Sequence, residues 1–135
     1  MLKSRHLNRE DTQMKVKHWT EVQAQDVADA PGVTIRWVLN EQDGAPHFAL
    51  RILEVQPGSA TPYHSHWWEH EVFVLDGQGV IATEAGESSL SAGSTVLVEG
   101  NELHQFRNTG DRLLRFICLI PHRWLEGLRA QHAGA

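Results

Sequence analysis

Apolar and polar residues alternate with a period of two along much of the chain. In residues 33–39, apolar side chains fall at every second position, which is the pattern of a half-buried β-strand. Similar segments predict strands at 48–55, 64–66, 71–75, 80–83, 88–90, 95–99, 103–106 and 113–120. Gly, Asp, Asn and Pro fill the segments between them, as in turns. Many short strands at this spacing predict an all-β domain, either a sandwich or a barrel.

Two of the connections are expected to be tight hairpin turns. They are residues 76–79 (Asp-Gly-Gln-Gly) and residues 84–87 (Glu-Ala-Gly-Glu). Pro121 is expected to end the last strand, and residues 124–130 are expected to form a short helix.

Length and composition restrict the class of protein. A chain of 135 residues is long enough for one domain with a sizeable core. The net charge of −5 and the scattered Lys and Arg residues argue against a nucleic-acid partner. No apolar stretch reaches 18 residues and no signal peptide is evident, so a cytoplasmic protein without a membrane partner is expected. The single cysteine, Cys118, fits a reducing compartment.

The first thirteen residues differ in character from the rest. Residues 1–13 are polar and lack an apolar repeat, which predicts a flexible N-terminal arm followed by a single domain at 14–135. The alternative is that Met14 is the natural start, since a domain-like sequence begins there.

Four histidines are candidates for a metal site. His64, His66 and His70 fall within seven positions, and His104 lies in the later segment 99–108. On an extended strand, His64 and His66 would project from the same face. Four neutral imidazoles suit a first-row transition metal. The alternative is that a His-x-His pair on an exposed strand binds nothing, since nine histidines in one chain cluster partly by chance.

The segments around these histidines resemble the two motifs of the cupin family. The first motif, G-x5-HxH-x3-E-x6-G, is matched by Gly58, His64, His66, position 70 and Gly77, with His70 in place of the usual glutamate. The second, G-x5-P-x-G-x2-H-x3-N, is matched by Gly93, His104 and Asn108, with Glu99 and Asn101 in place of Pro and Gly. The resemblance covers residues 32–121 and implies a double-stranded β-helix, the jelly-roll barrel.

The resemblance is closer to one branch of that family, the small single-domain cupins with four histidine ligands that bind manganese. Their HxHPWEHE-type core is similar to His-Ser-His-Trp-Trp-Glu-His-Glu in this chain, with Trp67 in place of proline. It implies one divalent transition metal per chain, manganese first and iron, nickel, zinc or copper as alternatives. The implied ligands are His64, His66, His70 and His104.

Several residues are candidates for the walls of a substrate pocket. They are Arg51 and Phe106, together with Phe116, Cys118 and Ile120, which the resemblance implies line the cavity opposite the metal. The alternatives are that the apolar ones are ordinary core, that Cys118 is inert and that Arg51 points outward. Glu69 and Glu71 either orient a ligand imidazole or are solvated. Trp67 and Trp68 are expected at an interface, with the pocket mouth and a cap on the sandwich as the alternatives.

The function expected from this pattern is that of a metal-dependent oxidoreductase of the dioxygenase type. Four ligands leave two positions of a six-coordinate ion for dioxygen, a peroxide or a bidentate small organic substrate. A metal-dependent isomerase or lyase and a non-catalytic small-molecule binding protein are the alternatives, because the fold hosts all three. Metal release is expected as the pH falls through about 6, the ordinary imidazole pKa. A homodimer that pairs through sheet edges is expected, as the resemblance implies.

Overall fold

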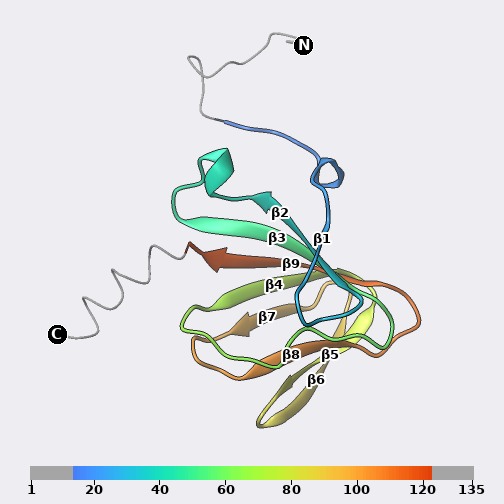
Figure 1. The fold of residues 1–135 in the computed structure, drawn as a ribbon. Helices are drawn as coiled ribbons and strands as arrows, with labels where there is room; N and C mark the ends of the chain where they lie inside the picture. Colours follow the sequence, from blue (N-terminus) through green and yellow to red (C-terminus); the bar gives the residue numbers. More distant parts are fainter. Residues whose placement is uncertain (1–13, 123–135) are drawn as a thin grey trace, which may run out of the picture.

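The computed structural model describes residues 14–122, which form an antiparallel β-structure (Figure 1). Nine strands and two short 3-10 helices lie in this part of the chain. The strands are β1 (Gln25–Asp26), β2 (Val33–Leu39), β3 (Phe48–Val55), β4 (His70–Asp76), β5 (Gln78–Thr83), β6 (Gly86–Ser91), β7 (Thr95–Val98), β8 (His104–Asn108) and β9 (Leu114–Pro121). The 3-10 helices are η1 (Trp19–Glu21) and η2 (Glu41–Asp43).

The strands form two sheets. The larger has the order β1-β2-β3-β9-β4-β7, and the smaller has the order β6-β5-β8. All neighbours are antiparallel, and β3 pairs with β9 along its whole length, from Phe48 opposite Pro121 to Val55 opposite Leu114. This is the jelly-roll barrel that the sequence predicted. The bounds of β2 and β3 also agree with the predicted ones.

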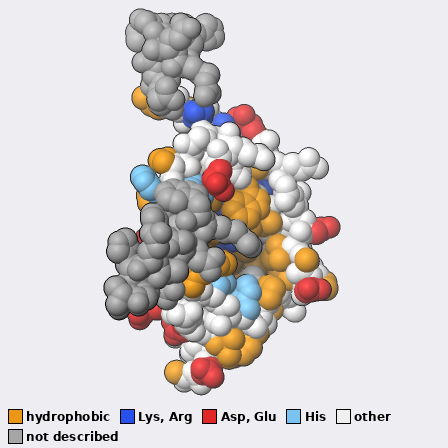
Figure 2. Space-filling view, turned by 60° about the vertical axis from the view of Figure 1, so that its left-hand side comes forward, with side chains coloured by type: hydrophobic (Ala, Val, Ile, Leu, Met, Phe, Trp, Pro, Cys, Tyr) orange, Lys and Arg blue, Asp and Glu red, His pale blue; other side chains and the backbone are white. Residues whose placement is uncertain are grey.

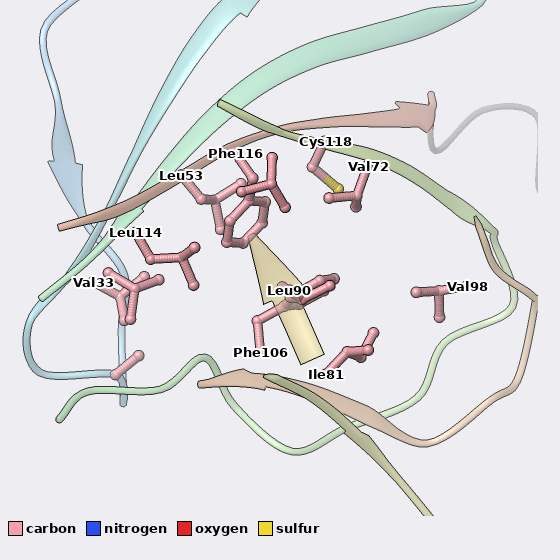
Figure 3. Close-up of a cluster of buried hydrophobic side chains, with 13 residues drawn as sticks. Val33, Leu53, Val72, Ile81, Leu90, Val98, Phe106, Leu114, Phe116 and Cys118 are labelled. Carbon is pink, nitrogen blue, oxygen red and sulfur yellow. The ribbon is translucent and has the colours of Figure 1, made fainter. Parts of the chain in front are cut away.

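The core lies between the two sheets, as Figure 3 shows. Phe116, Leu53 and Val72 point inward from the larger sheet, and Phe106 and Ile81 point inward from the smaller one. The rings of Phe106 and Phe116 stack across the interior with centroids 4.7 Å apart. Burial of these side chains holds the two sheets together.

The turn predicted at 76–79 is not a hairpin. β4 pairs with β7 and β9, whereas β5 pairs with β6 and β8, so the chain changes sheets at this corner. Gly77 has φ +91° and is buried, and a Cβ there would collide with the backbone of Leu113. Only glycine tolerates both conditions. The second predicted hairpin, between β5 and β6, is confirmed.

Three other expectations concern the ends of the chain and the first histidine pair. Residues 64–66 form no strand; His64 instead makes an isolated antiparallel bridge to His104. The predicted arm at 1–13 and the predicted helix at 124–130 lie outside the described residues. Within residues 14–122, no helix is long and apolar enough to cross a membrane.

Candidate metal centre

The backbone brings the four histidines to one end of the barrel. His70 is the first residue of β4 and His104 is the first residue of β8. His64 and His104 exchange two backbone hydrogen bonds, with N–O distances of 3.1 and 3.0 Å. The segment before His64 follows β8 in the same way, since Thr61 N donates to the carbonyl of Phe106 at 2.9 Å. Histidines far apart in sequence are thus held by ordinary antiparallel pairing.

The loop that carries His66 is fixed by the turn before His104. Asn101 N donates to the carbonyl oxygen of His66 at 2.6 Å. The neighbouring Gly100 has no Cβ, and one placed there would collide with the carbonyl oxygen of Trp67. The close approach of the two loops therefore depends on glycine at this position. It sets the path of the Trp67-Trp68 segment between His66 and His70.

Three of the histidines form a group that could hold a metal ion. Ring nitrogens of His64, His66 and His104 all lie within 4.8 Å of one another. His64 is exposed, His66 is half-buried and His104 is buried, so the group runs from the surface inward. The His70 ring lies beside them, with its centroid 4.4 Å from that of His66 and 5.0 Å from that of His104.

Backbone carbonyls determine which nitrogen of two rings is available. Nδ1 of His66 lies 3.2 Å from the carbonyl oxygen of Trp68, and Nδ1 of His104 lies 2.7 Å from that of Glu102. A carbonyl oxygen only accepts, so each Nδ1 carries the proton and each neutral ring keeps its lone pair on Nε2. Such contacts are what a metal-binding imidazole requires on its far nitrogen. The donor set therefore fits a transition-metal ion.

His70 is held in a different way. Its Nε2 lies 2.7 Å from Nε2 of His66, and its Nδ1 lies 2.8 Å from Sγ of Cys118. Since Nε2 of His66 is an acceptor, His70 carries its proton on Nε2 in this arrangement. For His70 to bind an ion through Nε2, the proton must move to Nδ1, where the sulfur of Cys118 can accept it. His70 as a fourth ligand stays a prediction.

Burial keeps these imidazoles neutral. It lowers the pKa of His66 to about 4 and the pKa of His70 to about 2, and it lowers that of His64 from its ordinary value. The positive charge of Arg51 adds to the effect on all three rings. Burial also raises the pKa of the Cys118 thiol, against an opposing effect of Arg51. Neutral imidazoles are the form that binds metal.

The histidines line a cavity of about 150 Å³. Figure 2 shows a hollow bordered by hydrophobic side chains, with histidine side chains at its edge. Of the residues predicted for the pocket, Arg51, Phe106, Phe116 and Cys118 lie in the wall of this cavity. Ile120 does not; it lines a second cavity of about 290 Å³, which shares Arg51 and Trp68 with the first. Phe106, Phe116 and Cys118 also belong to the core.

Sequence reasoning missed the groups that orient the rings. They are the backbone carbonyls of Trp68 and Glu102, which side-chain identity does not reveal. Glu69 and Glu71 are exposed and make no hydrogen bond to a described histidine ring. Trp68 lies in the cavity wall, where its indole stacks on His66 with centroids 4.0 Å apart.

Two further histidines lie outside this group. His122 is buried, and its Nε2 lies 2.7 Å from the carbonyl oxygen of Ala45. This contact fastens the end of β9 to the loop after η2. His47 is exposed.

Two curated proteins and a solved structure are similar to this chain. The chain is 32% identical over 71 residues to the 1-methylthio-D-xylulose 5-phosphate methylsulfurylase of Rhodospirillum rubrum, covering 53% of this chain and 46% of that protein. It is 30% identical over 69 residues to an oxalate-binding protein of Thermotoga maritima, covering 50% of this chain and 57% of that protein. The matches span about half the length of these relatives.

The solved structure is that of the polyketide cyclase RemF from Streptomyces resistomycificus. It superposes with a TM-score of 0.75 and 32% identity, covering 80% of this chain and 79% of that chain. The model of the cupin domain matches residues 51–120, which include Arg51, all four histidines and Cys118. This chain belongs to the cupin-domain family.

Proposed function

We propose that this protein is a metal-dependent enzyme that acts on a small, oxygen-bearing organic molecule at a mononuclear centre. His64, His66, His104 and His70 are the proposed ligands, and manganese is the proposed ion, with iron, nickel, zinc or copper as alternatives. The observation that carries the proposal is the convergence of three histidine ring nitrogens within 4.8 Å in the wall of a cavity. A bound ion would polarise a carbonyl or enolate oxygen of the substrate as a Lewis acid.

Backbone and side-chain groups around the histidines favour this chemistry. Backbone carbonyls hold the His66 and His104 rings so that each keeps its lone pair on Nε2. Apolar side chains, among them Leu53, Phe106 and Phe116, form most of the remaining wall. They exclude water, which strengthens electrostatic interactions inside the cavity.

The relatives support chemistry at substrate oxygens. Their names specify a polyketide cyclase, an oxalate-binding protein and a methylsulfurylase of a xylulose 5-phosphate derivative. Polyketides, oxalate and xylulose derivatives all carry carbonyl or carboxylate oxygens that a metal ion can bind. We therefore favour a cyclase, isomerase or lyase type of reaction for this chain.

One observation favours the dioxygenase-type oxidoreductase as a second candidate. Within the described part of the chain, the residues that line the histidine cavity include no Asp, Glu or Lys, and no histidine besides the four proposed ligands. An isomerase or lyase reaction requires a group that accepts the substrate proton. An oxidation that depends on the ion alone does not require such a group.

One experiment separates these candidates. The full chain is loaded with manganese and incubated in D₂O with pyruvate or acetylacetone, and loss of the carbon-bound protons is followed by NMR while an oxygen electrode records dioxygen. Proton exchange that disappears in His104→Ala supports the Lewis-acid proposal. Consumption of dioxygen without exchange supports the oxidoreductase. If a protein with stoichiometric metal gives neither signal, both enzymatic candidates are contradicted. A non-catalytic binding protein is then the remaining interpretation.

A further inference from the structure

Arg51 occupies an unusual position beside the metal centre. On β3 it pairs in register with Trp37 on β2 and Cys118 on β9, so the three residues form a row across the larger sheet. Its Nη2 donates to Sγ of Cys118 at 2.9 Å and lies 3.4 Å from Nδ1 of His70. Its Cζ lies 5.4 Å from the centre of the Trp37 ring. The guanidinium thus contacts a sulfur, an imidazole and an aromatic face.

No carboxylate balances the charge of Arg51 among residues 14–122. The ion pairs in this part of the chain involve Lys17, Arg36, Arg107, Arg112 and Arg115, each with an Asp or Glu, but not Arg51. Nε of Arg51 is also buried without a hydrogen-bond partner there. Arg51 as a residue is half-buried, so its charge is partly removed from water without an anion beside it. That cost is reduced when a negatively charged group binds.

The Trp68 indole supplies a second hydrogen-bond donor in the wall of the same cavity. Nε1 of Trp68 is buried and has no hydrogen-bond partner among the described residues. Trp68 and Arg51 are both in the walls of the histidine cavity and the adjoining cavity. Indole and guanidinium nitrogens donate hydrogen bonds and accept none. Both therefore require acceptor atoms, which the oxygens of an anion supply.

The charge of the residues that line the cavity also favours an anionic ligand. Among residues 14–122, its wall contains Arg51 and four histidines but no acidic residue. No described side chain of the wall therefore offsets the charge of Arg51. A cavity of about 150 Å³ is smaller than the roughly 300–1,000 Å³ of sites that bind drug-sized ligands. This favours a small ligand.

We propose that Arg51 and Trp68 bind the anionic group of the substrate, and that the substrate is a small oxyanion, a carboxylate or a phosphate, with a further oxygen directed at the histidines. Arg51 is then a binding residue, and the guanidinium fork selects planar carboxylates or phosphates over neutral molecules. This inference deepens the proposed function and rests on it for the role of the metal.

The test measures binding rather than turnover. The manganese content of the full chain is measured first, and oxalate, inorganic phosphate and neutral imidazole are then titrated by calorimetry. The variants are Arg51→Gln and Arg51→Lys, Trp68→Phe, which keeps a ring against His66 but removes the N–H, and the control Arg107→Gln. Arg107 pairs with Glu87 at the surface. Metal content is measured again after each titration.

We expect Arg51→Gln to weaken the affinity for oxalate or phosphate about tenfold to a hundredfold, the usual effect of losing a hydrogen bond to a charged group. Metal content and imidazole affinity should not change, Arg51→Lys should retain part of the affinity, and Arg107→Gln should behave like wild type. The ranking of oxalate and phosphate identifies the anion.

Two results would overturn the inference. One is equal affinity of wild type and Arg51→Gln for both anions. The other is a parallel loss of metal and of imidazole binding in Arg51→Gln, which would show a structural role. If wild type binds no metal, the proposed function fails. In that case, Arg51-dependent anion binding to the same protein would still support the inference, and its absence would overturn it.

Discussion

Sγ of Cys118 lies 2.8 Å from Nδ1 of His70, across the pairing of β9 with β4. Cys118 was expected either to line the substrate pocket or to be inert, and it contacts Nδ1 of His70, a position that a backbone carbonyl occupies at His66 and His104. If His70 binds the ion through Nε2, its Nδ1–H needs an acceptor, and this sulfur is the nearest one.

Cys118→Ala removes that acceptor. We expect the affinity for manganese to fall about tenfold or more, as is usual when a group that orients a metal-binding histidine is lost. Competition with a fluorescent chelator measures the affinity. Cys118→Ser keeps an acceptor and serves as the control, and it should lose less affinity than Cys118→Ala. Wild-type affinity in Cys118→Ala would show that the sulfur has no role in metal binding.

Gly100→Ala should damage the centre without touching a histidine. The added Cβ would collide with the carbonyl oxygen of Trp67, so the loop that carries His66 has to move. We expect a loss of about 1–3 kcal/mol in the free energy of unfolding, the usual cost of overpacking, together with weaker metal binding. Urea unfolding and the chelator assay measure the two effects. In Gly110→Ala, the control, the nearest atom to the Cβ is a side-chain atom of Gln78 at 3.3 Å. If both variants bind metal equally well, the contact at Gly100 does not position His66.

The stability of the metal-free protein, kept so by a chelator, should depend on pH below 6.5. Burial lowers the pKa of His66 to about 4 and that of His70 to about 2. Between these values and the ordinary 6.5, the unfolded chain binds protons at these rings and the folded chain does not. Acid therefore favours unfolding, so the free energy of unfolding should fall from pH 6.5 to 4 and be insensitive to these rings above 6.5. Urea unfolding in the presence of a chelator measures it.

His70→Gln is the control for this dependence, because it removes the ring with the lower pKa. Its free energy of unfolding should change less between pH 6.5 and 4 than that of wild type.

The same pKa values change the pH at which the metal-loaded protein is expected to release its ion. The ordinary imidazole pKa predicts metal release near pH 6, whereas His66 and His70 remain neutral well below this. We expect manganese to be retained at pH 5.5 in equilibrium dialysis. For metal-free wild type, a free energy of unfolding that stays constant from pH 7 to 4 would contradict the pKa values.

The homodimer expected from the sequence has a candidate surface. Phe48, Phe73, Leu75 and Leu97 are exposed on strands of the larger sheet. Beside them lies a groove of about 470 Å³, lined mainly by apolar side chains. We propose that this outer face, rather than a sheet edge, joins two copies. The double variant Phe73→Lys with Leu97→Lys should sediment as a monomer and the control Val16→Lys as a dimer. A monomeric wild type at micromolar concentration would contradict the proposal.

The fold was predictable where local pattern determines it. Alternation located β2 and β3, because one face of each is buried and the other is not. The corner at Gly77 was predicted to be a hairpin turn, because Asp-Gly is found both in hairpin turns and at this corner between two sheets. Which strands pair on either side of it is decided by contacts distant in sequence, such as β4 with β9. β1 has two residues, both exposed, and carries no pattern of its own.

The site was predictable only in part. Spacing brought His64, His66 and His104 together, as the structure shows. The contacts of His70 with Cys118 and of Arg51 with Cys118 depend on the register of β3, β9 and β4, which alternation does not specify. The carbonyls that orient His66 and His104 belong to the backbone and leave no mark in side-chain identity.

Metal content tests the central claim most directly. Plasma mass spectrometry is applied to wild type, His104→Ala, His70→Ala and the control His47→Ala, whose histidine is exposed outside the cavity. We predict about one manganese or similar ion per chain in wild type and in His47→Ala, none in His104→Ala, and a clear reduction in His70→Ala. Wild type without stoichiometric metal after reconstitution, or His104→Ala with as much metal as wild type, would contradict the metal centre.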